Sequence, residues 1–228
     1  MLELTYLGHS AVHIKTDAVR IIIDPFLDGN PLAATSPTTI NVDVICVTHG
    51  HGDHVGDTVS IARRTGALVV APYELAMFLS KKGCRVHPMH IGGRHEFAWG
   101  RVKLTPALHG SAFIDDNGTI TYTGNPCGFL LMLDGRTVYH SGDTGLSAEM
   151  SLIGRLNRID VAFLPIGDNF TMGPSDAAEA VRMLSPRIAI PMHYDTFEVI
   201  EADPEEFRNQ VTGNTRVEIL QPGKTLSV

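Results

Sequence analysis

The sequence predicts an α/β protein with a four-layer αββα sandwich, in which two β-sheets pack face to face and helices cover their outer faces. Short β-type runs come in clusters separated by single helical patterns, which differs from the strict alternation of a doubly wound parallel sheet. The 228 residues, 43% of them hydrophobic, are enough to bury one sizeable core. We therefore expect one domain over residues 1–228.

The first half of the chain contains both kinds of element. Apolar residues recur at helical spacing after His54 and stop at Gly66, and a second helical pattern covers residues 73–82. The expected strands are rich in Val, Ile and Thr, and they cover residues 3–7, 11–16, 19–24, 42–48 and 68–71.

The second half repeats this organisation. Strands are expected at residues 102–106, 127–133, 137–140, 161–165 and 188–191, and helices at 148–157, 174–184 and 204–211. The last two helices each open with a proline, which suits the first helical position. Residues 26–41 and 110–126 are long irregular segments, and we interpret them as candidate walls of a site.

The net charge, the first residues and the cysteines indicate which partner and which location we expect for the protein. The formal net charge of −7 argues against a broad basic surface for nucleic acid, so we expect a small-molecule substrate. The first residues lack a basic region followed by a long apolar stretch, which predicts neither export nor a membrane anchor. Cys46, Cys84 and Cys127 show no CxxC spacing, and this fits a cytoplasmic protein. Homo-oligomerisation stays open.

The strongest chemical signal is an HxHxDH motif between an expected strand and an expected helix. Two imidazoles two residues apart on a turning backbone can converge on one ion, while the following aspartate and histidine can point to a second ion. The intervening glycines relax the backbone for this bend. We interpret the segment as a metal site, and it consists of Thr48, His49, Gly50, His51, Gly52, Asp53 and His54.

At this motif the chain resembles the metallo-β-lactamase superfamily. Later elements extend the resemblance over nearly the whole length: His109, the Ser-Gly-Asp-Thr turn at residues 141–144, and His193, each just after an apolar strand. The resemblance implies the αββα fold of that superfamily and two metal ions. It assigns His49, His51 and His109 to one ion, Asp53, His54 and His193 to the other, and Asp143 to both as a bridge.

Four sequence segments narrow the resemblance to one branch of metal-dependent hydrolases. This branch is similar to the ascorbate-6-phosphate lactonase-like proteins. The four segments are LGHSAVHI, IIIDPF, GDNFTMGP and PMHYDTF. Class B β-lactamases of the main type place a cysteine among their ligands, where this chain has Asp143. Flavodiiron proteins carry an acidic residue at the position of His51 and add a flavin domain. Antibiotic hydrolysis and electron transfer are therefore disfavoured.

Two residues outside the ligand set are candidates for catalytic or supporting roles. The resemblance places His9, in a Gly-His-Ser turn, at the border of the metal pocket, where it could donate a proton, contact the substrate or be structural. Asp24 ends a strand before Pro25. Its carboxylate could accept the N–H of a ligand histidine and fix its tautomer, or it could cap the strand.

A glycine-flanked loop before the helix at Pro174 is the candidate substrate-binding segment. It contains Asn169, Thr171 and Met172, and the free N–H groups of the first helical turn favour an anion. We expect a phosphate or carboxylate of the substrate to dock here, with plain helix capping as the alternative.

These residues predict a hydrolase in which a metal-bridging hydroxide cleaves a small ester, with Asp53 binding metal and orienting the hydroxide. The expected anion site favours a phosphodiester or a phosphorylated lactone. Zinc is the first expectation for the two divalent ions, and manganese, nickel and iron stay open because histidine and carboxylate ligands suit them all. A mononuclear iron dioxygenase and a non-catalytic metal-binding regulatory module are the alternatives.

Overall fold

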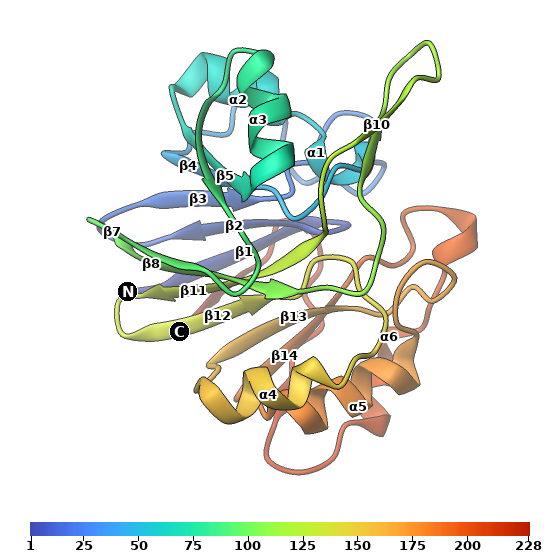
Figure 1. Cartoon of the computed structure of the whole chain (residues 1–228). Coiled ribbons are helices and arrows are strands. Elements are labelled where there is room, and N and C mark those ends of the chain that lie inside the picture. The colour runs from blue at the N-terminus through green and yellow to red at the C-terminus, as the bar shows by residue number, and fades with distance from the viewer.

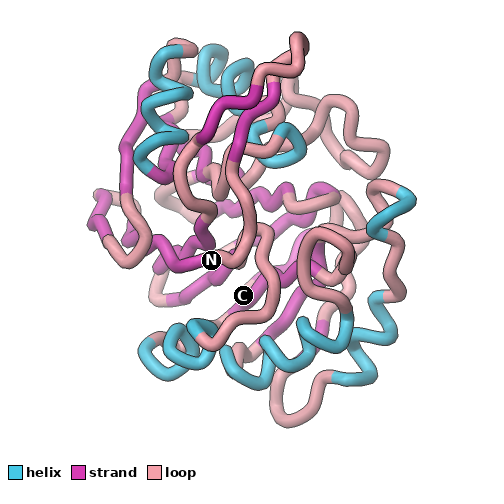
Figure 2. Tube along the Cα trace, turned by 45° about the vertical axis from the view of Figure 1, so that its right-hand side comes forward, coloured by secondary structure: helices cyan, strands magenta, loops and turns pink.

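Two β-sheets of seven strands each lie face to face at the centre of the protein, as a computed structural model of residues 1–228 shows (Figure 1). Helices α1, α2 and α3 lie on the outer side of the first sheet, and α4, α5 and α6 lie on the outer side of the second. The turned view gives the same succession of layers (Figure 2). The expected four-layer αββα sandwich is confirmed.

The first sheet combines the N-terminal strands with one strand from the end of the chain. Its strands β3 to β6 pair in parallel, whereas β16, β1, β2 and β3 pair antiparallel. In sheet order the strands are β16 (Thr225–Ser227), β1 (Glu3–Gly8), β2 (Ala11–Lys15), β3 (Arg20–Ile23), β4 (Val44–Cys46), β5 (Leu68–Pro72) and β6 (Arg85–Met89).

The second sheet has a parallel half and an antiparallel half. Its inner strand β13 is buried at every position, as expected for a strand that is covered on both faces. In sheet order the strands are β15 (Arg216–Val217), β14 (Ile188–Met192), β13 (Val161–Pro165), β12 (Arg136–His140), β11 (Cys127–Leu133), β8 (Gly100–Pro106) and β7 (Arg94–Phe97).

The helices are short and amphipathic. Pro174 and Pro204 open α5 and α6, where the missing N–H of proline costs no helical hydrogen bond. None of the helices has the length and apolar character that a membrane crossing needs. They are α1 (Gly52–Val55), α2 (Thr58–Thr65), α3 (Tyr73–Lys81), α4 (Glu149–Leu156), α5 (Pro174–Leu184) and α6 (Pro204–Gln210), with a 3₁₀ turn at Glu198–Ile200.

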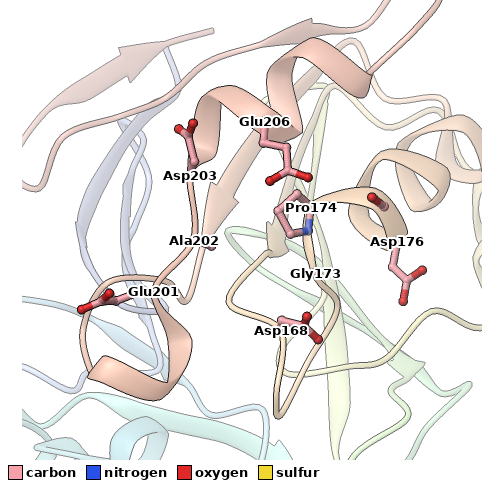
Figure 3. Close-up of a pocket in the computed structure, with 9 residues that line it drawn as sticks. Asp168, Gly173, Pro174, Asp176, Glu201, Ala202, Asp203 and Glu206 are labelled. Atoms are coloured by element: carbon pink, nitrogen blue, oxygen red, sulfur yellow. The ribbon is translucent and has the colours of Figure 1, made fainter.

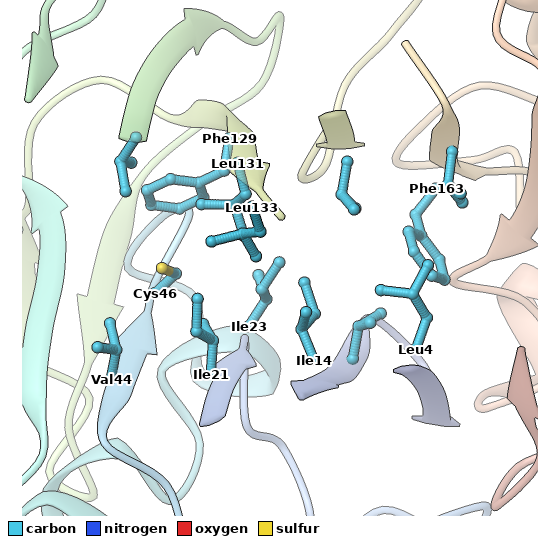
Figure 4. Close-up of a cluster of buried hydrophobic side chains, with 14 of the residues drawn as sticks. Leu4, Ile14, Ile21, Ile23, Val44, Cys46, Phe129, Leu131, Leu133 and Phe163 are labelled. Atoms are coloured by element: carbon cyan, nitrogen blue, oxygen red, sulfur yellow. The ribbon is translucent and has the colours of Figure 1, made fainter. Parts of the chain in front are cut away.

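The largest hydrophobic core lies between the two sheets. It contains 23 buried residues, and Figure 4 shows side chains such as Leu4 and Ile14 from the first sheet facing Phe129 and Phe163 from the second. Two further cores of 18 and 17 buried residues join each sheet to its own helices. Close packing of this kind fixes the strand ends, and with them the loops that follow.

The expected strands and helices are present, with four differences. The helix after His54 is divided into α1 and α2 at Gly56, whose φ of 38° ends the first turn. The polar edge strands β6 and β7 and the short end strands β15 and β16 were not expected. Residues 110–126 contain a hairpin, β9 (Ala112–Ile114) and β10 (Ile120–Tyr122), which projects from the body of the protein (Figure 1).

Candidate metal centre

The ligand-type side chains meet at the end of the sandwich where strands of both sheets finish. In the first sheet, His9 follows β1, Asp24 follows β3, and the HxHxDH motif follows β4. The second sheet contributes three residues to the same place, His109 after β8, Asp143 after β12 and His193 after β14. Backbone strain marks these positions, since His9, Asp24 and His193 have φ values of 56°, 46° and 55°, which are uncommon for non-glycine residues.

The turn of the motif is held against the segment that carries the hairpin. A Cβ atom on Gly50 would overlap the side chain of Thr123, so this position requires glycine for space. The N–H of Gly50 donates to Ser111 Oγ at 3.1 Å, and Ser111 Oγ lies 2.8 Å from Thr123 Oγ1. Gly52 has open space around it and begins α1. The expected bend therefore depends on close backbone approach at Gly50.

Three histidines form the first group of donors. His51 Nδ1 lies 3.0 Å from His49 Nε2 and 3.3 Å from His109 Nε2. One ring nitrogen from each residue lies within 4.8 Å of the other two, so the three can face a common point. These are the three residues that the resemblance to the metallo-β-lactamase superfamily implies for one ion.

The second group contains Asp53, His54 and His193, joined by His9, with ligand-type atoms again within 4.8 Å of one another. Asp143 lies between the two groups. Its Oδ2 atom is 3.2 Å from His54 Nε2, 3.0 Å from His193 Nε2 and 3.6 Å from His109 Nε2. This is where a ligand shared by two ions would have to lie.

The donor atoms of this cluster fit a cation better than they fit one another. His54 Nε2, Asp143 Oδ1 and both ring nitrogens of His193 are buried without a hydrogen-bond partner. Buried polar atoms without a partner cost free energy, and most proteins avoid them. A metal bound between these atoms would satisfy them, and the donor set of imidazoles and carboxylates is one that divalent transition metals accept.

The electrostatics of the cluster also suit a metal. Burial lowers the pKa of His49 well below its ordinary value and leaves the ring neutral. Burial alone would raise the pKa of Asp143, but His193 and His54 outweigh it and hold that pKa well below its usual range. Burial lowers the pKa of His54, yet the carboxylates of Asp143, Asp53 and Asp24 raise it overall, so a positive charge is favoured at this point. A cation can supply that charge in place of the proton.

Asp24 orients two of the ligand-type histidines. Its Oδ2 accepts the Nδ1–H of His54 at 2.8 Å and the hydroxyl of Thr48 at 2.6 Å. Because Thr48 Oγ1 donates to Asp24, it accepts the Nδ1–H of His49, 2.9 Å away. Both histidines are thereby fixed with Nε2 free toward the centre. The role of Thr48 was not anticipated from the sequence, where it is only the residue before the motif.

His9 is completely buried beside Asp53, and both of its ring nitrogens are occupied. Nε2 lies 3.0 Å from Asp53 Oδ2, and Nδ1 lies 2.9 Å from Thr196 Oγ1. Burial lowers the pKa of His9 to about 4, so the ring is neutral at neutral pH and donates through Nε2 to the carboxylate. This geometry favours a positioning role for His9 at Asp53, and its role as a proton donor or a substrate contact stays a prediction.

The segment expected to bind an anion has a different character in the structure. Met172 is fully buried in the core that includes α5, so its side chain cannot reach a substrate; Asn169 is exposed and Thr171 is half-buried. The start of α5 opens onto a cavity of about 480 Å³ whose walls carry five carboxylates (Figure 3). They belong to Asp168, Asp176, Glu201, Asp203 and Glu206. Their negative charge disfavours a phosphate or a carboxylate at this position, and the anion site expected before Pro174 stays a prediction.

A second cavity, of about 200 Å³, opens directly onto the metal-type ligands. Five of the residues that line it are His51, Asp53, His109, Asp143 and His193, and the sixth is Phe170. Phe170 could not be recognised from the sequence, because it lies between polar neighbours in a loop without periodicity.

Comparison with known protein families agrees with this fold and centre. A model of the Beta-lactamase superfamily domain matches residues 19–194, which include all seven proposed ligands. The fold and the His/Asp centre therefore define the metallo-β-lactamase class of proteins.

Individual relatives cover the whole chain. A "UPF0173 metal-dependent hydrolase" of Anoxybacillus flavithermus is 56% identical over 227 residues, and the alignment covers 100% of both chains. Among solved structures, the metallo hydrolase Igni18 of Ignicoccus hospitalis is 40% identical with a TM-score of 0.89, over 99% of this chain and 97% of that one. A metal-dependent hydrolase structure from Parabacteroides distasonis is 26% identical, with a TM-score of 0.74 over 96% and 93% of the two chains. The chain belongs to the UPF0173 metal-dependent hydrolase family of the metallo-β-lactamase superfamily.

Proposed function

We propose that this chain is a dinuclear metal-dependent hydrolase that cleaves a small ester with water. One observation carries the proposal: two groups of buried and half-buried donor residues face each other across Asp143 at an open cavity, and atoms of His54, His193 and Asp143 there have no hydrogen-bond partner. The names of the relatives, which describe metal-dependent hydrolases, support the same class of reaction.

The two ions would be held by the residues that form the two groups. Histidine and carboxylate donors suit zinc first, and also manganese, nickel or iron. When bound, such ions would lower the pKa of a coordinated water, to about 7 for zinc, and polarise the carbonyl or phosphoryl oxygen of the substrate. The ligands are His49, His51 and His109 for one ion and Asp53, His54 and His193 for the other, with Asp143 shared.

The protein's own contribution is to hold these groups and the water in fixed positions. Asp53 is 29% exposed and lines the cavity, so its carboxylate can accept a hydrogen bond from a water there and orient it. His9 fixes that carboxylate through its Nε2–H, and Asp24 fixes the rings of His54 and His49. Groups held in this way need no rearrangement as charge develops on the substrate.

The proposed substrate is a small ester, and the sequence favoured a phosphodiester or a phosphorylated lactone. That preference depended on an anion site at Pro174, where the carboxylates described above have the wrong charge. A carboxylic ester or a lactone does not need such a site. A mononuclear iron dioxygenase needs only one ion, so the second group of donors does not support this alternative. The second group does not support a non-catalytic module either.

Metal removal and replacement test this proposal. Purified protein should contain two divalent ions per chain, lose esterase and lactonase activity with a chelator, and recover activity when metal is returned. His49→Ala should lose at least one ion and most of the activity, whereas His95→Ala, a change in an exposed histidine on β7, should match the wild type. One iron per chain with oxygen uptake would support the dioxygenase instead. Full metal loading without turnover of any ester would contradict hydrolysis.

A further inference from the structure

Three large apolar side chains are exposed on loops around the ligand-type residues. Leu108 is 63% exposed next to His109, Phe170 is 55% exposed in the wall of the 200 Å³ cavity, and Phe197 is 40% exposed shortly after His193. Scattered exposed apolar side chains are ordinary, but apolar groups gathered around a concave site indicate a binding surface.

The loop that presents Phe170 is built to keep this ring outside the core. Met172 anchors the loop in the core, and its N–H donates to Thr144 O at 3.0 Å, directly beside Asp143. Asp168 and Asn169 have φ values of 56° and 46°, so the backbone is strained at the two residues before the phenylalanine. Strain that holds an aromatic ring in solvent does not help folding, and such strain is common at functional sites.

The other two apolar side chains are fixed close to the same centre. The N–H of Leu108 donates to Thr144 Oγ1 at 3.0 Å, and Leu108 O accepts from Gly145 N at 3.0 Å. Leu108 and Phe170 are therefore both attached to the turn that follows Asp143. Phe197 packs edge-on against His9, with ring centroids 5.5 Å apart. Apolar surface thus borders the ligands of both sheets.

The charges around this surface disfavour an anionic substrate. No lysine or arginine lines the 200 Å³ cavity. The neighbouring cavity, which shares the loop of Phe170 through Asp168, is lined by carboxylates that include Glu201 and Asp203. Apart from the proposed ions, no cationic side chain is present to pair with a phosphate or a carboxylate on the substrate, and the carboxylates of the neighbouring cavity disfavour such a group.

We propose that the substrate is an uncharged carboxylic ester or lactone with an apolar group that packs against Phe170. This inference rests on the proposed function and specifies its substrate class. Water adds to the acyl carbon, the bond from that carbon to the ester oxygen breaks, and the proton lost by water passes to the departing oxygen. The products are a carboxylic acid and an alcohol, without any change of oxidation state. Phe170 is a specificity-determining residue in this reaction.

A series of p-nitrophenyl esters tests the substrate class with the metal-loaded protein. From acetate to butyrate, two methylene groups are added to the acyl chain, and kcat/KM should rise about tenfold. Replacing the terminal methyl of butyrate by a carboxylate, as in the hemisuccinate, should lower kcat/KM about tenfold or more. Bis(p-nitrophenyl) phosphate should be a poorer substrate than any neutral ester. Equal rates for acetate and butyrate, or a preference for the phosphate, would overturn the inference.

Two variants test the role assigned to Phe170. Phe170→Ala should bring the butyrate-to-acetate ratio of kcat/KM close to one, mainly through KM, while the metal content stays at the wild-type level. Leu156→Ala removes an equally exposed apolar side chain from α4 and should leave the ratio unchanged. Circular dichroism of both variants checks that they fold. An unchanged ratio in folded Phe170→Ala would contradict the assignment.

Binding of 4-phenylbutan-2-one separates this inference from the proposed function, because this neutral ketone cannot be hydrolysed. Calorimetry should detect binding to the wild type and to Leu156→Ala, and about fivefold weaker binding to Phe170→Ala. If no ester is turned over while the ketone binds as expected, the proposed hydrolysis fails and the apolar site stands. If esters are hydrolysed but the ketone binds wild type and Phe170→Ala equally, the apolar site fails and hydrolysis stands.

Discussion

Asp24 shows how a residue that touches no substrate can determine the chemistry of the centre. It is completely buried, and it accepts hydrogen bonds from the imidazole of His54 and from the backbone and hydroxyl of Thr48. Its two carboxyl oxygens share these hydrogen bonds, Oδ1 with the backbone N–H of Thr48 and Oδ2 with the other two donors. The tautomers of two ligand-type histidines therefore depend on this one side chain.

Asp24→Asn should lower the affinity for metal about 10-fold to 100-fold. The new amide N–H₂ would face Thr48 or His54, whose donor groups would then lack an acceptor. Competition with a chromophoric chelator measures this change. Asp43→Asn is the matched control, since Asp43 is exposed before the start of β4, while the motif follows the other end of that strand, and its carboxylate contacts only Arg20. Equal metal affinities for Asp24→Asn and the wild type would show that Asp24 does not orient the ligands.

The residues that can be predicted from the sequence are those with a local pattern. The ligand-type residues between His49 and His54 are recognisable because their spacing carries the chemistry. The function of Thr48 depends on the position of Asp24, 24 residues earlier, and that of Phe170 depends on which side of a loop faces solvent. Met172 was placed in the candidate substrate-binding segment for the same reason, since nothing in the local sequence shows that its side chain is buried and that of Phe170 is exposed.

At the level of structural elements, the turn of the HxHxDH motif also shows that a local sequence pattern does not reveal contacts with distant residues. Its glycines look equivalent in the sequence, but Gly50 is pressed against Thr123 of the hairpin segment and Gly52 has free space. The apolar runs that form β4 and β13 were predictable, because strands covered on both faces are continuously apolar. The polar β6 and the hairpin strand β10 lack such a pattern and form through pairing with neighbours.

Substitutions of Gly50 and Gly52 by alanine should therefore differ in their effect on the stability of the protein. Gly50→Ala should destabilise the protein by about 1–3 kcal/mol, because the new methyl group must displace Thr123. Gly52→Ala should change stability by less than about 1 kcal/mol, since it meets no neighbour and alanine favours the first turn of α1. Urea unfolding of the two variants measures the difference. Equal free energies of unfolding for the two variants would mean that the loop of Thr123 can move to accommodate Gly50→Ala without loss of stability.

At the scale of the whole molecule, buried polar contacts join the two sheets next to the centre. His140, at the end of β12, lies 3.0 Å from the carbonyl of Ser10 through Nε2, and its Nδ1 accepts from Gly142 N at 3.2 Å. The carbonyl of His9 accepts from the N–H of His193 at 2.8 Å. Loops of the first sheet are thus hydrogen-bonded directly to loops of the second.

The neutral state of His140 should make this junction sensitive to acid. Burial lowers the pKa of His140, while the unfolded chain keeps a value of about 6.5. Below about pH 6.5 the unfolded chain binds the extra proton, so stability is complete above that pH and falls as the pH is lowered toward the folded pKa.

His140→Gln should remove this contribution while keeping a donor for Ser10 O and an acceptor for Gly142 N. With chelator present, the free energy of unfolding of the wild type should fall with decreasing pH more steeply than that of the variant, by up to about 1.4 kcal/mol per pH unit. Urea titrations between pH 7.5 and pH 5 measure the two slopes. Equal slopes for the wild type and His140→Gln would show that His140 binds its proton as readily in the folded protein as in the unfolded chain.

The origin of the ligands in both sheets affects how the molecule assembles. Because His49 to His54 extend from one half of the sandwich and His109, Asp143 and His193 from the other, neither half can bind the ions with full affinity by itself. Metal uptake as proposed would therefore act as a reversible cross-link between the halves, and each tenfold rise in free metal above the Kd of an ion would add about 1.4 kcal/mol to the stability of the native state. The supply of metal would then affect the stability of the protein as well as its activity.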